Sequence, residues 1–196
     1  MSAEPPRPSL LAETASSMRG VWRMLTFRSD WKTYFNVTET GVARSFLGVI
    51  LALPAFALMV AAVNHFAAEN PAIASMEARI TLGEAALIWA RFWLVFPVLA
   101  AVMAMVLSVR DRFASWLVVH NWAVFSLIHL QAAYWALYAA GLADAQALGS
   151  LVAIYQIVRL FVHWRVAHAA LGLPIGLSTL AAAVPLVADS LIMAAL

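Results

Sequence analysis

The chain has 196 residues, of which 64% are hydrophobic and 11% are charged, and its formal net charge is +2 at pH 7. This length accommodates one helical bundle with an N-terminal tail, and it excludes a second soluble domain of ordinary size. Cysteine is absent, which excludes disulfides, thiolate nucleophiles, iron–sulfur clusters and zinc–thiolate sites.

The tail, residues 1–43, contains one amphipathic pattern. Met18, Val21, Trp22 and Leu25 follow the i, i+3, i+4, i+7 spacing that places side chains on one face of an α-helix. We expect this helix to lie in the membrane interface, where anionic headgroups attract nearby basic residues. We interpret it as an anchor that orients the bundle, and the alternative is a lipid-sensing or partner-binding role.

Five long apolar runs follow the tail. Each is close to the ~20 residues that cross ~30 Å of hydrocarbon as an α-helix. They predict an all-α fold, in which residues 44–196 form a polytopic membrane bundle of five transmembrane helices. The predicted spans are residues 45–63, 85–108, 114–140, 147–167 and 173–196.

Basic residues lie almost entirely on one side of the predicted spans. By the positive-inside rule that side is cytoplasmic, so we expect the N-terminus in the cytoplasm and, after five spans, the C-terminus in the periplasm. The arginine-rich and alanine-rich composition is typical of GC-rich bacteria, which predicts a bacterial inner membrane. The basic residues on the predicted cytoplasmic side are Arg7, Arg19, Arg23, Arg28, Lys32, Arg44, Arg110, Arg112 and Arg165, against Arg79 in the opposite loops.

Polar side chains at membrane depth are the main functional candidates, because each ionisable group there costs roughly 2.5–3.5 kcal/mol on insertion scales. On the fourth span, Gln156, Arg159 and His163 fall on one side of the helix and form a polar stripe. Arg159 lies near mid-bilayer, so we expect it to face the bundle interior, a water-filled cavity or an anionic partner. The alternative is a structural arginine bonded to backbone carbonyls or a neighbouring glutamine.

On the third span, His120 and Gln131 share one side with Tyr134 and Tyr138. The third and fourth spans are joined by a short turn, so we expect them to be antiparallel neighbours, with His120 and His163 at similar depth. Two histidines at matched depth can ligate haem b. The alternative is a pair of hydrogen-bonded core residues without a cofactor. No metal site is predicted, because no carboxylate lies at that depth.

On the fifth span, Asp189 lies about two turns from the outer end. Arg91 occupies a comparable outer position on the second span, so an ion pair between these two residues is within reach. Alternatively, Arg91 marks the membrane interface, and Asp189 has another partner or remains protonated, as a proton-coupled carboxylate does. Pro185 leaves one carbonyl of the fifth span without its helical donor and predicts a kink.

The order of these features resembles bacterial five-helix membrane proteins of the Yip1-domain type, with residues 22–46 leading from a cytoplasmic tail into five spans and an outward C-terminus. The resemblance covers most of the chain but rests on no diagnostic motif, so it assigns no functional residue. It implies a non-enzymatic membrane protein, with eukaryotic relatives that organise membranes and bind trafficking partners. The five-span tryptophan-rich sensory proteins of the translocator type are less similar, because they lack a long basic tail.

Short loops and the absence of a catalytic or nucleotide-binding motif predict a non-enzymatic accessory or scaffold subunit, or a homo-oligomer, without a cofactor. Its expected partners are the lipid bilayer and other membrane subunits or a second copy, and not nucleic acid. The alternative is a small proton-linked carrier or permeation protein that uses Arg159, His163, His120 and Asp189. A haem-binding redox protein and a membrane enzyme with a buried acid–base pair are two further hypotheses.

Overall fold

The computed structural model describes residues 9–70 and 79–195, so Arg7 and the last residue of the fifth predicted span lie outside it. Within the described ranges the chain is mainly α-helical and has no β-strand. The five long helices are α3 (Gly48–Glu69), α4 (Leu82–Val106), α5 (Phe113–Ala139), α6 (Ala145–Leu171) and α7 (Ile175–Ala195). The shorter elements are α1 (Leu10–Leu25), α2 (Glu39–Ser45) and the 3-10 helices η1 (Ser29–Tyr34) and η2 (Arg110–Arg112).

All five long helices are long and apolar enough to cross a membrane, which confirms the predicted fold class. Their bounds follow the predicted spans closely, except that α3 continues six residues beyond its predicted end at residue 63. The polar side chain of Asn64 explains the difference. It accepts a hydrogen bond from the N–H of Ile80 at 2.7 Å and donates one to the carbonyl of Ile80 at 3.0 Å. The extension of α3 is thereby attached to the segment that enters α4.

Side-chain caps in the sequence fix the ends of the helices around the bundle. Thr81 and Glu84 form a capping box at the start of α4. Asp144 caps α6 by accepting a hydrogen bond from the N–H of Ala147 at 2.7 Å. Gly172 ends α6 in the left-handed conformation, with φ +59°, which favours glycine. The short connection that follows makes α6 and α7 antiparallel neighbours.

The helix α5 lies at the centre of the bundle. It contacts α3, α4 and α6 as well as the shorter helices α1 and α2. In its most apolar stretch 61% of the residues are buried inside the protein, against 28% or less for the other four spans. A buried hydrogen bond of 2.9 Å from the amide of Asn121 to the hydroxyl of Ser45 joins α5 to the end of α2. The other four long helices therefore leave most of their surface uncovered by the protein.

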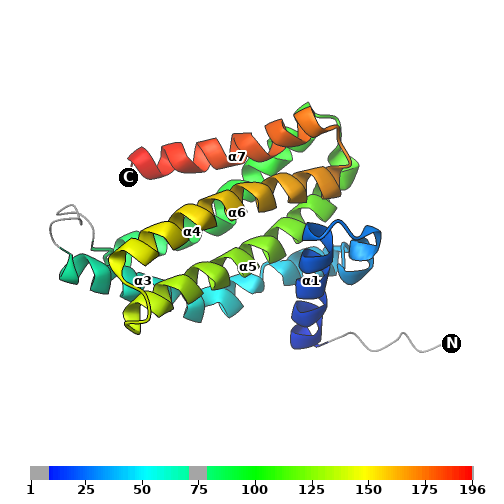
Figure 1. Cartoon of the computed structure of the whole chain (residues 1–196). Coiled ribbons are helices and arrows are strands. Elements are labelled where there is room, and N and C mark those ends of the chain that lie inside the picture. Colours follow the sequence, from blue (N-terminus) through cyan, green and yellow to red (C-terminus); the bar gives the residue numbers. More distant parts are fainter. Residues whose placement is uncertain (1–8, 71–78, 196) are drawn as a thin grey trace.

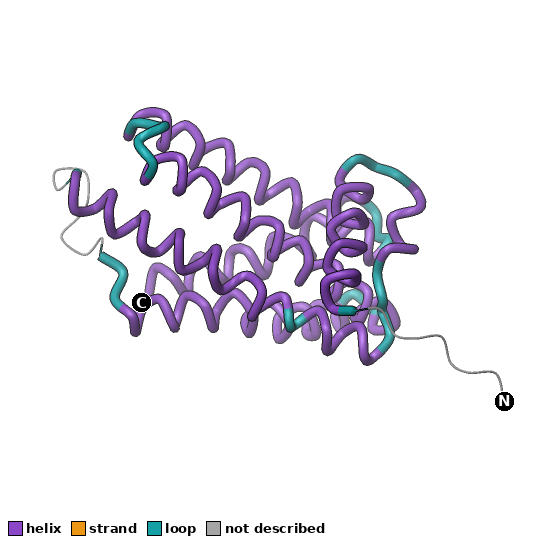
Figure 2. The backbone as a smooth tube through the Cα atoms, turned by 90° about the horizontal axis from the view of Figure 1, so that it is seen from below, coloured by secondary structure: helices purple, strands orange, loops and turns teal. Residues whose placement is uncertain are grey.

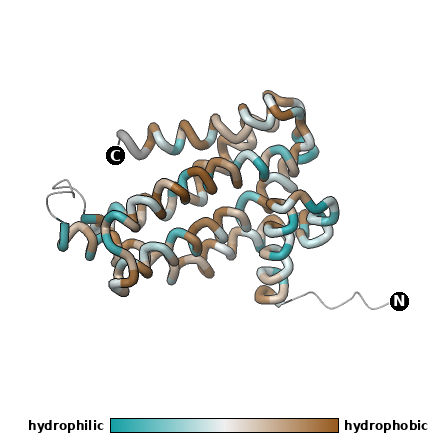
Figure 3. The backbone as a smooth tube through the Cα atoms, in the orientation of Figure 1, coloured by the Kyte–Doolittle hydropathy of each residue, from teal (hydrophilic) through white to brown (hydrophobic). Residues whose placement is uncertain are grey.

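The bundle has two distinct ends. The N-terminal end carries α1, η1, α2 and the connections between α4 and α5 and between α6 and α7 (Figure 1). The C-terminal end carries the α5–α6 turn and the end of α7. The long helices run alongside one another between these ends, as Figure 2 shows from below. Hydrophilic segments gather around α1 and at the ends, while hydrophobic segments dominate the spans (Figure 3).

The predicted amphipathic helix is present as α1, which crosses the long axis of the bundle (Figure 1) and packs on α5 and α6. Of the predicted apolar face, Val21 is buried against the bundle, whereas Trp22 is 68% exposed. The face that packs on the bundle is formed by Glu13, Ser17, Gly20, Val21 and Met24. Hydrophobic spacing located the helix, but it did not reveal that small and polar residues make the contact with the bundle.

Polar contacts hold α1 against the bundle. The carboxylate of Glu13, with 6% of its side chain exposed, pairs with Arg44 at 2.8 Å. At the other end of the helix, Nε of Arg165 in α6 donates a hydrogen bond of 2.9 Å to the carbonyl of Met24. This carbonyl belongs to the negative end of the helix dipole, which favours a neighbouring cation.

Substituting Gly20 with alanine is expected to loosen this attachment. A Cβ atom at Gly20 would lie 2.6 Å from Cε2 of Phe35 and 2.8 Å from Cβ of Tyr34, so the two segments must move apart. We expect a loss of about 1–3 kcal/mol in the free energy of unfolding. Thermal unfolding in mild detergent measures it. The matched control is Gly149→Ala in α6, where nothing lies within 4 Å of the added atom and stability should not fall.

Candidate functional site

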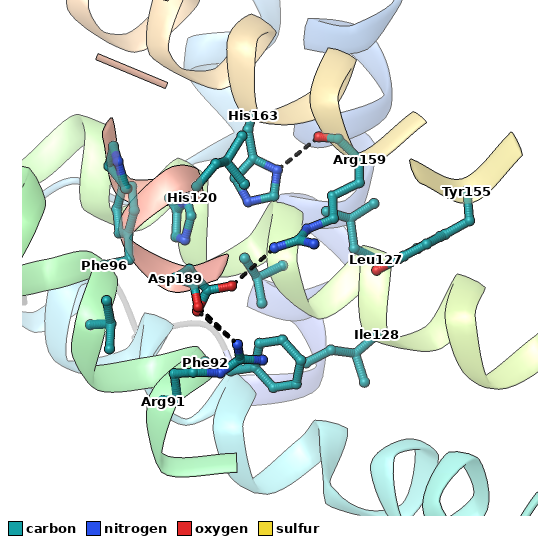
Figure 4. Close-up of a pocket in the computed structure, with 14 residues that line it drawn as sticks. Arg91, Phe92, Phe96, His120, Leu127, Ile128, Tyr155, Arg159, His163 and Asp189 are labelled. Atoms are coloured by element: carbon teal, nitrogen blue, oxygen red, sulfur yellow. Dashed lines mark hydrogen bonds and ion pairs between the residues drawn. The ribbon is translucent and has the colours of Figure 1, made fainter. Parts of the chain in front are cut away.

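Three charged side chains from three helices meet inside the bundle. Arg91 of α4, Arg159 of α6 and Asp189 of α7 form this charged cluster (Figure 4). Nη1 of Arg91 lies 3.3 Å from Oδ1 of Asp189 and also 3.3 Å from the backbone carbonyl of that residue. Nη2 of Arg159 lies 3.0 Å from the other carboxylate oxygen. One carboxylate therefore bridges two guanidinium groups.

The charged cluster carries a formal charge of +1 at membrane depth. Its side chains are largely removed from solvent, with 10% of Arg91, 16% of Asp189 and 25% of Arg159 exposed. The Nε–H of Arg91 is fully buried and has no hydrogen-bond partner among the described residues. Buried donors without a partner cost roughly 1–3 kcal/mol, and more when they are charged. The cluster thus has an uncompensated positive charge and a buried N–H whose hydrogen bond is not formed.

A cavity of about 50 Å³ adjoins the charged cluster on the side toward the N-terminal end. A buried water occupies roughly 10–15 Å³ by the same measure, so the cavity has room for a few waters or one small ion. His120 and His163 line it, with their ring centroids 5.4 Å apart. Phe96 stacks on His120 at a centroid distance of 3.2 Å. Nδ1 of His163 lies 2.8 Å from the carbonyl of Arg159, which leaves Nε2 for another partner.

A polar groove adjoins the charged cluster on the side toward the C-terminal end. It has a volume of about 300 Å³. Gln131, Gln156 and Ser190 contribute to its lining. Tyr155 lines both the groove and the cavity, so it stands at the junction between them. The groove, the charged cluster and the two histidines therefore form a continuous series of polar groups along the bundle.

The structure decides several of the alternatives that the sequence left open. The predicted ion pair between Arg91 and Asp189 is present, and Arg91 is inside the bundle rather than at the membrane interface. Arg159 faces the interior as expected, and its side-chain partner is Asp189, not a glutamine. His120 and His163 lie at matched depth, as predicted.

The stripe predicted on the third span does not converge on one site. Gln131 lines the groove, whereas the hydroxyl of Tyr138 contacts Glu69 and Asn70 at the end of α3, at 2.9 and 2.8 Å. Among the residues that sequence reasoning did not select, Phe92, Phe96 and Tyr155 enclose the cavity. Aromatic residues in apolar spans give no signal that separates such a role from ordinary packing.

The two histidines do not fit a haem in this packing. The cavity beside them is far smaller than the roughly 300–1,000 Å³ of pockets that hold drug-sized ligands. The face of His120 is also covered by the ring of Phe96. Among residues 9–70 and 79–195, no group of three or more histidine, aspartate or glutamate side chains is placed to hold a metal ion.

Comparison of the chain with protein-family models, with curated proteins and with solved structures finds no match. The resemblance to Yip1-domain proteins therefore stays a prediction from architecture. Function must be inferred from the chemistry of the charged cluster and the groups around it.

Proposed function

We propose that this protein is a small, non-enzymatic membrane carrier that binds a small monovalent anion at the charged cluster. The observation that carries the proposal is the charge count: two guanidinium groups share one carboxylate, and the Nε–H of Arg91 has no acceptor within the described structure. In a low-dielectric interior an uncompensated charge is costly, so a monovalent anion beside the cluster relieves that cost. The size of the cavity favours a chloride- or nitrate-sized ion over a large organic acid.

The histidines connect this anion site to protons. His120 and His163 both border the cavity, and a neutral imidazole can accept a proton. Co-transport of a proton with a monovalent anion moves no net charge across the membrane, and an anion in the cavity favours the charged form of a neighbouring imidazole. Transport by this protein is therefore proton-linked, with the imidazoles as the proton-accepting groups.

The carrier lies in a bacterial inner membrane with its N-terminus in the cytoplasm and its C-terminus in the periplasm. The basic residues support this orientation, because α1, η1, α2 and η2, which carry most of them, lie together at the N-terminal end of the bundle. The polar groove then faces the periplasm, and an anion enters from that side.

The proposal is tested by uptake of radiolabelled chloride into proteoliposomes under an imposed pH gradient. We expect uptake that nitrate competes with strongly and sulfate weakly, and that Arg91→Gln abolishes. The matched control is Arg79→Gln, which makes the same change in charge at an exposed residue outside the spans. Absence of uptake by the native protein, or equal uptake by the two variants, would contradict the carrier function.

A scaffold or accessory subunit is the second candidate function. The observation in its favour is that the charged cluster ties α4, α6 and α7 together, which is also what a purely structural network does. Under this alternative, Arg91→Gln changes the assembly of the protein with other subunits or with itself. The test is affinity purification of both variants from native membranes, followed by mass spectrometry. Under this alternative a partner protein is lost with Arg91→Gln and kept with Arg79→Gln.

A further inference from the structure

A second cationic site lies at the N-terminal end of the bundle, outside the spans and independent of the proposed transport function. Trp22, Arg23, Thr26, Phe27 and Arg28 line a surface hollow at the C-terminal end of α1. Trp22 and Phe27 are 68% and 62% exposed. Exposed aromatic rings beside arginines are typical of the membrane–water interface, where one part of the side chain is in contact with lipid and the other with water.

An ion pair orients one of the two arginines of this hollow, and Arg28 supplies its uncompensated charge. Asp30 binds Arg23 through Nε at 2.8 Å and Nη2 at 2.5 Å, which fixes the guanidinium and leaves Nη1 for another acceptor. The hydrogen bond from Arg23 holds the pKa of Asp30 below its ordinary value. Because the folded pKa lies below the unfolded one, the pair contributes at neutral pH and is lost only in strong acid. Arg23 thus remains paired with Asp30 at physiological pH.

Phe27 occupies an unusual backbone position at the edge of the hollow. Its φ is +60°, in the left-handed region where glycine normally ends a helix. A side chain in this region costs roughly 1–2 kcal/mol. The centroid of the Phe27 ring lies 4.5 Å from Cζ of the Arg165 guanidinium. It lies 6.3 Å from the ring centroid of Phe161 in α6. The contacts of the ring with Arg165 and Phe161 offset this backbone cost and hold Phe27 at the edge of the hollow.

An apolar strip continues from this point along α6 toward the centre of the membrane. Phe161, beside Phe27, is 39% exposed. Leu160, Ile157 and Ile154 follow along α6 across its midpoint, and each is more than half exposed. The cationic hollow therefore lies at the end of a lipid-facing apolar surface.

We propose that the hollow at Trp22, Arg23 and Arg28 binds the headgroup of one anionic phospholipid, whose acyl chains lie along the exposed face of α6. Charge complementarity identifies the occupant, because arginines supply the phosphate contacts. The adjoining apolar strip identifies it as a lipid rather than a free phosphate. This site makes α1 a lipid-binding element that fixes the N-terminal end of the bundle at the membrane surface.

Native mass spectrometry of the detergent-solubilised full chain tests the proposal. Phosphatidylglycerol or phosphatidylcholine with the same acyl chains is titrated into the protein. We expect one tightly bound phosphatidylglycerol and weaker phosphatidylcholine binding. Arg28→Gln should weaken phosphatidylglycerol binding about fivefold, corresponding to the loss of ~1 kcal/mol per interfacial basic residue. The matched control is Lys32→Gln in η1, an exposed residue that does not line the hollow and loses the same charge.

Equal weakening by Arg28→Gln and Lys32→Gln would overturn the proposal in favour of general surface charge. Equal binding of the two lipids would overturn it as well. A third outcome concerns thermal unfolding. If inorganic phosphate protects the protein to the same degree as phosphatidylglycerol, the hollow is a phosphate site instead. A second measurement follows Trp22: brominated-chain phosphatidylglycerol in nanodiscs should quench the native protein more than Trp22→Phe, and equal quenching would place this ring away from lipid.

Discussion

Asp189→Asn is expected to lower the free energy of unfolding by about 3–5 kcal/mol, because it leaves two buried guanidinium groups without a counter-charge. The carboxylate is the only acidic side chain that contacts Arg91 or Arg159 in the described part of the chain. Removing its charge raises the formal charge of the cluster from +1 to +2 at membrane depth. Thermal and denaturant unfolding in mild detergent measure the loss.

The control for this variant is Asp111→Asn. Asp111 lies in η2, its side chain is 78% exposed, and its distance to Arg112 is 3.7 Å. An exposed pair of this kind contributes roughly 0–1 kcal/mol. Chloride or nitrate should restore part of the stability of Asp189→Asn and have little effect on Asp111→Asn. Equal stability of the two variants would show that the charged cluster is not a buried network.

Arg159→Gln is expected to weaken anion binding about 10- to 100-fold while the protein stays folded. One arginine and one carboxylate then remain, so the cluster becomes neutral and loses its attraction for an anion. Removing an arginine leaves fewer uncompensated charges than removing the carboxylate, so this variant should be more stable than Asp189→Asn. Anion-dependent thermal stabilisation and chloride uptake provide the two measurements.

The double variant Arg159→Gln with Asp189→Asn separates charge from geometry. It retains Arg91 alone, and its formal charge of +1 equals that of the native cluster. We expect it to be more stable than Asp189→Asn alone, since residues within one ion-pair network are not additive. Recovery of chloride-dependent stabilisation would show that net charge governs anion binding. A double variant as unstable as the sum of the single variants would contradict direct coupling between Arg159 and Asp189.

The spans could be predicted from the sequence because apolar length alone specifies a membrane helix. Polar residues near the helix ends caused the errors in the boundaries. Asn64 suggested an end to the first span, but its side chain satisfies the backbone of Ile80 and the helix continues. The sequence pattern also located α1, but it did not show which of its residues pack on the bundle, because hydrophobic spacing does not distinguish a lipid-facing residue from a protein-facing one.

The contact between Arg159 and Asp189 was missed, although the sequence contained a signal for it. Arg159 lies 12 residues before the end of α6 at Leu171, and Asp189 lies 14 residues after the start of α7 at Ile175. A short link between two antiparallel helices places residues at such matched separations side by side. The pairing of Asp189 with Arg91 was predicted by depth alone. Both arginines share one carboxylate because three helices pack around it. No local sequence pattern encodes that packing.

The central position of α5 has a consequence for how the protein is made. This helix is the least apolar of the five spans, and most of its surface is covered by neighbours. When it emerges from the ribosome, α3 and α4 are already in the bilayer, but α6 has yet to be synthesised. The side of α5 that packs on α6, including Tyr134 beside Tyr155, therefore lacks its neighbour until α6 arrives. Chains truncated before residue 145 should remain accessible to membrane proteases, whereas chains that include α6 become protected during their own insertion.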